Sequence, residues 1–222
     1  MSISIKIDGI YDEQTLLSCV EEGVSHFGFD FRPKSFNFLQ QHVFMEMLKK
    51  FDRPDFYFHL HFDSESDFVV KKFCDDILKI KNFSDKYILN FEELNSVDFF
   101  SQFSFPFIVK YRPGLDYSDF FENKYFKGFT FDYFELEENY LQNLNSQYAN
   151  KLLTNIFQKI SDRNLLSILK VDWDTHFHTG LFEFLSFSHI SLSINQKMEI
   201  SYRNPNVAEI SRNIHNFKQI DL

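Results

Sequence analysis

The chain has 222 residues, which is enough for one large α/β domain or two small ones and long enough to bury a substantial core. Its formal net charge of −9 provides no basic surface of the kind that holds a phosphate backbone, so we expect no nucleic-acid partner. Phenylalanine is abundant, with 31 residues, and glycine is scarce, with six, so aromatic rings must supply much of the core.

Strand-like and helix-like segments alternate along the chain. Apolar runs and apolar–polar alternation predict strands at residues 3–7, 26–29, 56–62, 86–89, 107–111, 128–131, 165–170 and 189–194. Apolar residues spaced three and four apart predict helices at residues 13–22, 38–50, 66–78, 152–160 and 207–217. The polar segment 136–150, rich in Asn and Gln, predicts either an extended loop or an additional helical turn.

Eight repeats of strand then helix predict an α/β fold with a parallel sheet, and eight units favour a closed (βα)8 TIM barrel with outer helices. No linker interrupts the alternation, so we expect a single domain over residues 1–222. In such barrels the chemistry lies at the carboxyl ends of the strands, where the strand-to-helix loops form the mouth. Asp8 stands at the end of the first predicted strand, so we expect its carboxylate to face the mouth.

The segment IKIDGIYDEQTLLSCVEEGVSHFGFDFRPKS, residues 5–35, resembles the start of the phosphoribosylanthranilate isomerases, barrel enzymes of the tryptophan pathway. The residues that fit that family are Lys6, Ile7, Gly9, Ile10, Gly23, Gly28, Phe29, Phe31, Pro33, Lys34 and Ser35. FTFDYF, residues 129–134, is similar to the family's sixth strand with its acidic residue at Asp132. The resemblance implies a TIM barrel that rearranges an aminoaldose to an aminoketose.

The resemblance implies catalytic roles for two carboxylates. Asp132 matches the family's acid, and Asp8 occupies the position of the cysteine that serves as its base. A carboxylate can also remove a proton, and two carboxylates can act as acid and base when their environments separate their pKa values. The change from cysteine therefore does not by itself abolish the reaction.

The sequence departs from the family where the substrate phosphate is held. The family uses backbone N–H groups of glycine-rich turns after strands seven and eight. Here Val171 and Asp172 occupy the first glycine pair, and Ser193 is followed by Ile194 and Asn195. Like charges about 5 Å apart repel by about 3 kcal/mol at an effective dielectric of about 20, so a phosphate near Asp172 and the following Asp174 should bind poorly. Positions that carry His and Arg in the family are Asn90 and Asn37.

We therefore expect a divergent member of this family that has lost the ordinary isomerase reaction, a pseudoenzyme, and binds another small molecule or a protein partner. The candidate ligand-binding residues are Lys6, Asn37, Asn90, Asp172, Ser193 and Asn195. The alternative is an active Amadori-type isomerase with Asp8 as base and Asp132 as acid. A fold of this kind does not choose between them.

A third hypothesis is a metal-dependent barrel hydrolase. His59 and His61 alternate on the third strand and share a face, as do His176 and His178 if that segment is extended. Barrel hydrolases that use such pairs usually carry them on the first strand, which has no histidine here, so we expect no metal site.

The remaining features indicate an ordinary soluble protein. Cys19 and Cys74 are isolated and lie in predicted helices, where buried inert thiols are typical. No apolar stretch reaches the ~18 residues that span a bilayer, and the start shows no signal-peptide pattern, so we expect a cytoplasmic protein without a membrane partner. We expect no cofactor, and either a monomer or a homodimer.

Overall fold

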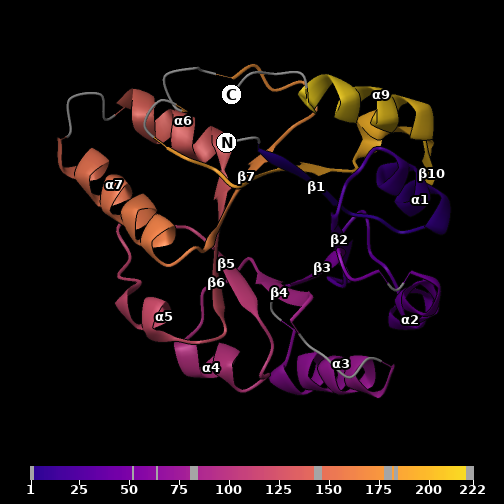
Figure 1. The fold of residues 1–222 in the computed structure, drawn as a ribbon, viewed down its shortest axis with the longest axis horizontal. Helices are drawn as coiled ribbons and strands as arrows, with labels where there is room; N and C mark the ends of the chain where they lie inside the picture. Colours follow the sequence, from indigo (N-terminus) through magenta and orange to yellow (C-terminus); the bar gives the residue numbers. More distant parts are fainter. Residues whose placement is uncertain are drawn as a thin grey trace.

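Eight parallel strands form a closed barrel in which each strand pairs with the next and the eighth closes onto the first (Figure 1). The computed structural model describes residues 3–51, 53–63, 65–80, 85–142, 147–177, 182 and 185–218. The barrel strands are β1 (Ser4–Asp8), β2 (His26–Asp30), β3 (Tyr57–Phe62), β4 (Tyr87–Phe91), β5 (Phe107–Lys110), β6 (Phe126–Asp132), β7 (Leu166–Val171) and β8 (His189–Ser193). This confirms the predicted α/β barrel, with strand boundaries within two residues of those expected.

Helices surround the barrel on the outside, as Figure 1 shows. They are α1 (Glu13–Glu21), α2 (Gln41–Lys50), α3 (Asp67–Ile80), α4 (Val97–Ser101), α5 (Ser118–Glu122), α6 (Tyr133–Gln142), α7 (Gln147–Asp162) and α9 (Val207–Lys218). The connection from β8 to α9 contains a short 3-10 helix, η1 (Gln196–Met198), and an antiparallel pair, β9 (Glu199–Ser201) and β10 (Asn204–Pro205). No helix in the described ranges is both long and apolar enough to cross a bilayer.

The polar segment 136–150 is the place where the sequence-based prediction was least definite. The structure extends α6 from Tyr133 to Gln142 and starts α7 at Gln147, so most of this segment is helical rather than a loop. Residues 143–146 lie outside the described part. Both helices therefore belong to the connection between β6 and β7.

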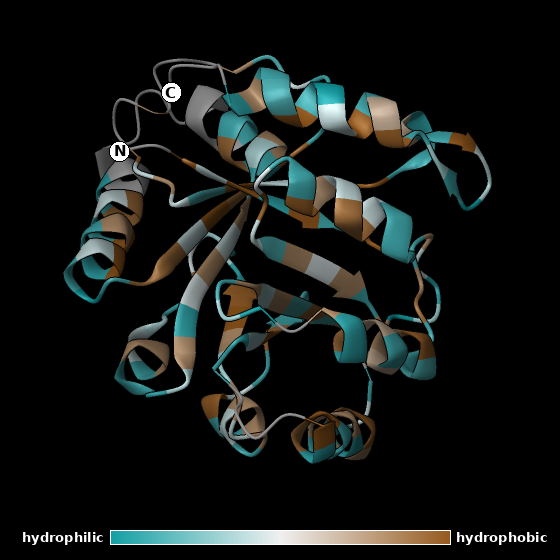
Figure 2. Ribbon diagram, turned by 45° about the vertical axis from the view of Figure 1, so that its right-hand side comes forward, coloured by the Kyte–Doolittle hydropathy of each residue, from teal (hydrophilic) through white to brown (hydrophobic). Residues whose placement is uncertain are grey.

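The larger hydrophobic core lies between the barrel and the helices and is built mainly from phenylalanine rings. The rings of Phe29 and Phe44 have centroids 4.9 Å apart, and those of Phe29 and Phe58 are 6.0 Å apart. Figure 2 shows hydrophobic and hydrophilic residues interleaved along the outer helices, which is the pattern of helices that bury one face. Cys19 and Cys74 are free thiols buried in this layer, and burial raises the pKa of each to about 12.

Along each strand, side chains that point outward into this core alternate with side chains that point into the barrel. The inward side chains are apolar on one side of the barrel interior and polar on the other. On the side of β4, β5 and β7, a small cluster of Ile88, Ile108 and Ile168 packs with Leu166. On the side of β1, β2, β3 and β8, the buried side chains are polar. These are Lys6, Asp8, His26, Asp30, His59, His189 and Ser191.

Candidate ligand site at the barrel mouth

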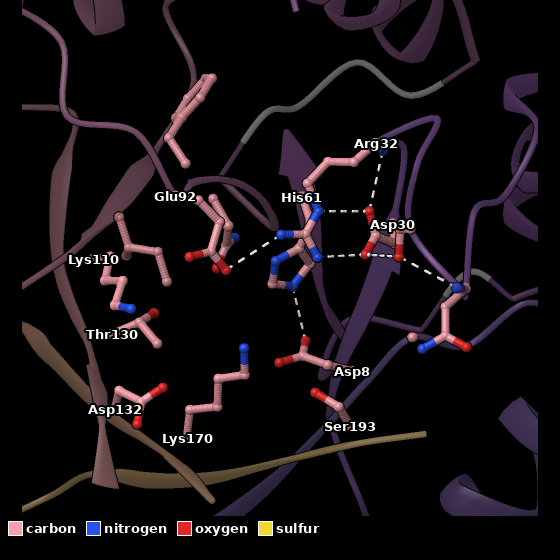
Figure 3. Close-up of a pocket in the computed structure, with 16 residues that line it drawn as sticks. Asp8, Asp30, Arg32, His61, Glu92, Lys110, Thr130, Asp132, Lys170 and Ser193 are labelled. Atoms are coloured by element: carbon pink, nitrogen blue, oxygen red, sulfur yellow. Dashed lines mark hydrogen bonds and ion pairs between the residues drawn. The ribbon is translucent and has the colours of Figure 1, made fainter. Parts of the chain in front are cut away.

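A cavity of about 240 Å³ lies at the carboxyl ends of the strands, where the barrel architecture places functional sites (Figure 3). Charged and polar side chains from all eight strand ends line it. The lining residues are Asp8, Gly9, Asp30, Arg32, Ser35, Asn37, His61, Asn90, Phe91, Glu92, Ile108, Lys110, Thr130, Asp132, Lys170 and Ser193. Because the lining is largely polar, the cavity suits a small hydrophilic molecule better than an apolar one.

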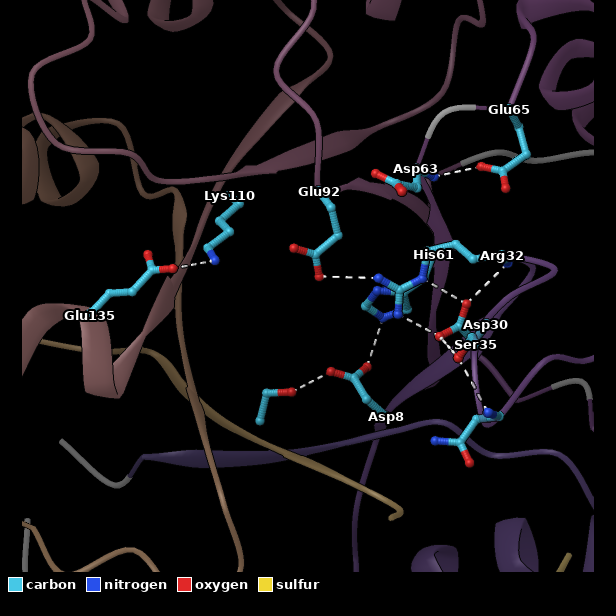
Figure 4. Close-up of polar contacts among 12 residues, drawn as sticks. Asp8, Asp30, Arg32, Ser35, His61, Asp63, Glu65, Glu92, Lys110 and Glu135 are labelled. Atoms are coloured by element: carbon cyan, nitrogen blue, oxygen red, sulfur yellow. Dashed lines mark hydrogen bonds and ion pairs between the residues drawn. The ribbon is translucent and has the colours of Figure 1, made fainter. Parts of the chain in front are cut away.

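The Asp8 carboxylate is held by three neighbours. The Nε2 atom of His61 lies 2.8 Å from Oδ1 (Figure 4). Lys6 donates to the same oxygen from beneath, and the hydroxyl of Ser191 donates to Oδ2. An ionised carboxylate only accepts hydrogen bonds, so His61 carries its hydrogen on Nε2. Lys6 is 1% exposed, which makes this a buried ion pair at the base of the cavity.

The electrostatics of this pair keep Asp8 ionised. Burial alone would raise the pKa of Asp8, but Lys6 and His61 outweigh it and hold the pKa well below its ordinary value. Burial lowers the pKa of Lys6, and the nearby Asp8 offsets only part of that effect. A carboxylate with a low pKa and donors on both oxygens is a weak base.

Gly28 makes the contact between Asp8 and His61 possible. It lies on β2, between the strands that carry the two side chains. A Cβ atom built on Gly28 would overlap Asp8 Oδ1 and lie 2.9 Å from His61 Nε2. Because Gly28 has no side chain, the side chains of Asp8 on β1 and His61 on β3 can meet across β2.

A second set of charges forms the rim on the side of β2 and β4. Arg32 Nε donates to Asp30 Oδ1 at 2.8 Å, and its Nη1 reaches Glu92 Oε1 at 3.3 Å. The hydroxyl of Ser35 donates to Asp30 Oδ2 at 2.6 Å. Burial raises the pKa of Asp30, but the Arg32 hydrogen bond and nearby charges lower it by more, so this carboxylate also stays ionised.

The opposite rim is formed by β5, β6 and β7. Asp132 Oδ1 accepts the N–H groups of Phe134 at 3.1 Å and Glu135 at 3.3 Å, so it caps the start of α6. Lys110 donates to the Glu135 side chain at 2.7 Å. Within the described part of the chain, Lys170 forms neither an ion pair nor a hydrogen bond through its ammonium group, and Figure 3 shows this group directed toward the middle of the lining residues.

In the turns that follow β7 and β8, side chains of the same turns accept hydrogen bonds from the backbone N–H groups. The amide of Trp173 donates to Asp172 Oδ1 at 2.8 Å, and the amide of Asp172 donates to the hydroxyl of Thr175 at 2.9 Å. In the eighth turn, the amide of Lys197 donates to Asn195 Oδ1 at 3.0 Å. Asn195 also donates to Asp172 at 3.0 Å, so one side chain links the two turns.

The two carboxylates at these turns, Asp172 and Asp174, share a counter-charge that the sequence analysis did not include. The ammonium group of Lys197 lies 2.7 Å from Asp172 and 2.9 Å from Asp174, so it neutralises part of their charge. Burial raises the pKa of Asp172, but Lys197 and two other donors lower it by more. The sequence suggests no such pairing, because Lys197 and Asp172 are far apart along the chain.

The predicted site residues divide into two groups. The cavity lining includes Asp8, Asn37, Asn90, Asp132 and Ser193. The others do not line it, because Lys6 is buried beneath Asp8 and because Asp172 and Asn195 bond to each other in the turns.

The two asparagines are held by backbone carbonyls. Asn37 Nδ2 donates to the Ile194 carbonyl at 2.6 Å, and Asn90 Nδ2 donates to the Ile88 carbonyl at 2.8 Å. The Oδ1 atom of each is buried without a hydrogen-bond partner.

Sequence reasoning missed five charged or titratable residues of the cavity. They are Arg32, His61, Glu92, Lys110 and Lys170. His61 was considered only as a metal ligand. The useful signal was present, because each of the five stands at or just after the end of a predicted strand, as Asp8 does.

The histidines proposed for a metal site do not come together. His59 and His61 both face the barrel interior, but Nε2 of His59 lies 3.0 Å from Nδ1 of His26, whereas His61 contacts Asp8. No group of three or more His, Cys, Asp or Glu residues in the described ranges is arranged to hold a metal ion. His178 lies outside these ranges.

Comparison with known proteins places the fold beside one group of enzymes. No protein-family model matches the chain, and no curated protein matches it. Among solved structures, the phosphoribosylanthranilate isomerase of Thermotoga maritima is similar with a TM-score of 0.64 and 15% identity, over 98% of this chain and 100% of that one. This likeness shows the fold alone.

Two further solved structures are also similar in fold. A phosphoribosylanthranilate isomerase in complex with reduced 1-(o-carboxyphenylamino)-1-deoxyribulose 5-phosphate has a TM-score of 0.63 and 15% identity, over 98% of this chain and 100% of its own. The aldo-keto reductase AKR11C1 of Bacillus halodurans has a TM-score of 0.56 and 10% identity, over 100% of this chain and 87% of its own. The likeness therefore reaches barrels with different chemistry.

Proposed function

We propose that this chain is a phosphoribosylanthranilate isomerase-like barrel that has lost the ordinary isomerase reaction and binds a different small molecule at its mouth. The observation that carries the proposal is the state of the seventh and eighth turns. Side-chain oxygens of Asp172, Thr175 and Asn195 accept the backbone N–H groups of these turns. A phosphate would have to displace these internal hydrogen bonds, and it would approach Asp172 and Asp174, whose charge Lys197 neutralises only in part.

The environment of Asp8 supports the same conclusion. A base that removes a carbon-bound proton works best when its pKa is near the working pH. The pKa of Asp8 is instead well below its ordinary value, and donors occupy both of its oxygens. Asp8 therefore serves to balance the buried Lys6 charge.

The alternative, an active Amadori-type isomerase, is supported by one observation. Asp8 and Asp132 line the same cavity, which an acid and base acting on one substrate require. If this alternative holds, purified protein will convert an aminoaldose to an aminoketose, and Asp8→Asn and Asp132→Asn will each abolish that activity.

Complementation of a tryptophan auxotroph that lacks the isomerase tests the proposal most directly. We expect no growth with this chain and growth with the Thermotoga maritima isomerase as the positive control. Growth would overturn the proposed loss of function.

A calorimetric titration with inorganic phosphate tests the physical cause. We expect no binding to the protein as it is, and measurable binding to a double variant, Asp172→Gly with Asn195→Gly, because it exposes backbone N–H groups. Equal phosphate affinity in both proteins would contradict the account of the turns.

A further inference from the structure

Most charges that line the cavity already have partners within the protein. Asp8 is paired with Lys6, Asp30 and Glu92 with Arg32, and Lys110 with Glu135. A ligand that displaced one of these ion pairs would gain little binding free energy, because it would leave one charge of the pair without its counter-charge. The groups available to a ligand are therefore those that remain.

Two opposite charges remain without an ion pair or hydrogen bond, and they lie on neighbouring strands. The charge of Lys170 acts from a distance on Glu92, whose pKa burial raises and the Lys170 and Arg32 charges lower by more. Asp132 on β6 and Lys170 on β7 are directly paired in the sheet register, yet no ion pair within 4.0 Å joins them. Asp132 uses Oδ1 to cap α6, while no hydrogen bond reaches its Oδ2 from the described residues. In Figure 3 no dashed line ends at the Lys170 ammonium.

Hydroxyl groups flank these two charges. Thr130 lies two residues before Asp132 on the same side of β6, and Ser193 ends β8, the strand that pairs with β7 on its other side. Both line the cavity. They can donate to or accept from a polar ligand between the two charges.

We propose that the cavity binds a small α-amino acid as its zwitterion, with the ligand carboxylate on Lys170 and the ligand ammonium group on the free oxygen of Asp132. This inference rests on the proposed function, because it assigns the ligand of the same site. The zwitterion satisfies both unpaired charges and adds no net charge to the cavity.

Other ligand classes satisfy less of the site. A simple carboxylic acid leaves Asp132 without a partner, and a simple amine does the same to Lys170. A phosphate dianion meets one unpaired cation and four lining carboxylates, which repel it. The volume of about 240 Å³ is also below the ~300 to 1,000 Å³ typical of pockets for larger ligands.

The first experiment screens the full-length protein by thermal shift against the common L-amino acids, one at a time, at millimolar concentration. The best amino acid is then compared by calorimetry with its matched 2-hydroxy acid, its decarboxylated amine and inorganic phosphate. We expect binding of the amino acid only. The inference is overturned if no amino acid binds, or if the hydroxy acid or the amine binds equally well.

Variants then identify the residues responsible. Lys170→Met and Asp132→Asn should each weaken binding by about 10- to 100-fold, which is the usual effect of removing a hydrogen bond to a charged group. Asparagine is also a good helix cap, so Asp132→Asn should preserve the start of α6. Lys127→Met is the matched control, because Lys127 is an exposed lysine of β6 that does not line the cavity, and this variant should bind the amino acid as the unmodified protein does.

The outcomes separate this inference from the proposed function. Growth of the complemented auxotroph would overturn the proposed function and this inference with it. Absence of amino acid binding without growth would overturn only the ligand assigned here. Unchanged affinity in Lys170→Met, with the variant as stable as the parent, would also overturn it.

Discussion

The two halves of the barrel interior solve the same packing problem with different chemistry. The half formed by β4, β5 and β7 is filled by Ile88, Ile108 and Ile168, which need no partners beyond each other. The half formed by β1, β2, β3 and β8 is filled by a lysine, aspartates, histidines and a serine, which hydrogen-bond to one another or pack ring against ring. Apolar packing tolerates small changes, whereas a buried polar network fails when one member is lost.

The difference has a consequence for the site. In the polar half, Asp8 and His61 are held in place by hydrogen bonds within the protein, including the one between them, so these groups are not available to a ligand. In the apolar half, Lys170 follows Ile168 by two residues on β7, and the isoleucines offer its ammonium group no hydrogen bond. Lys170 is therefore not drawn into such a network, and the four predictions below test this contrast between the two halves.

The largest expected effect comes from removing the charge of Asp8. Asp8→Asn leaves the Lys6 ammonium buried without a counter-charge, which should cost about 3–5 kcal/mol in the free energy of unfolding. Urea denaturation of the two proteins measures this difference. The double variant Lys6→Met with Asp8→Asn should recover part of the loss, because no buried charge remains. A single variant as stable as the parent would show that Lys6 finds another partner.

Acid should destabilise the polar half almost as strongly. Burial lowers the pKa of His26 to about 3 and that of His189 to about 4, and each also feels neighbouring positive charge. In the unfolded chain both titrate near ~6.5, so below that pH the unfolded state binds protons that the folded state does not. Stability should therefore fall as pH falls, by about 2 kcal/mol per histidine between pH 7 and about pH 5.

Urea midpoints measured across this pH range test the prediction. Replacing both histidines with glutamine should flatten the pH dependence, since glutamine does not titrate. His59 is also buried, and its pKa lies well below the ordinary value, so some slope should remain. A midpoint independent of pH in the unmodified protein would mean that these rings are hydrated.

Gly28→Ala should have an intermediate effect. The added methyl group overlaps Asp8 Oδ1 and crowds His61 Nε2, so the network must shift, at a cost of about 1–3 kcal/mol. A double-mutant cycle with Asp8→Ala checks the cause, because the methyl group should cost much less once the carboxylate is gone. Additive losses would place the strain elsewhere in β2.

The strands and most helices were predictable because each repeats a strong local pattern. The segment 136–150 was not, since its Asn and Gln residues hide the helical periodicity, although Leu136 at its start is buried. The positions of Asp8 and Asp132 at strand ends predicted that they face the mouth, and both line the cavity there. The sequence did not reveal that Gly28 joins Asp8 to His61, or that Lys197 neutralises Asp172, because these contacts depend on register and on loop conformation.

The smallest expected effect lies in the apolar half. Ile168→Val removes one methyl group from a fully buried side chain and should cost about 1 kcal/mol, the usual value for this change. The members of this cluster are all aliphatic and do not titrate, so the loss should be the same at pH 7 as at acid pH. Urea denaturation of the variant and its parent at both pH values measures the two differences. A loss that grows on acidification would mean that the two halves are coupled through the barrel interior.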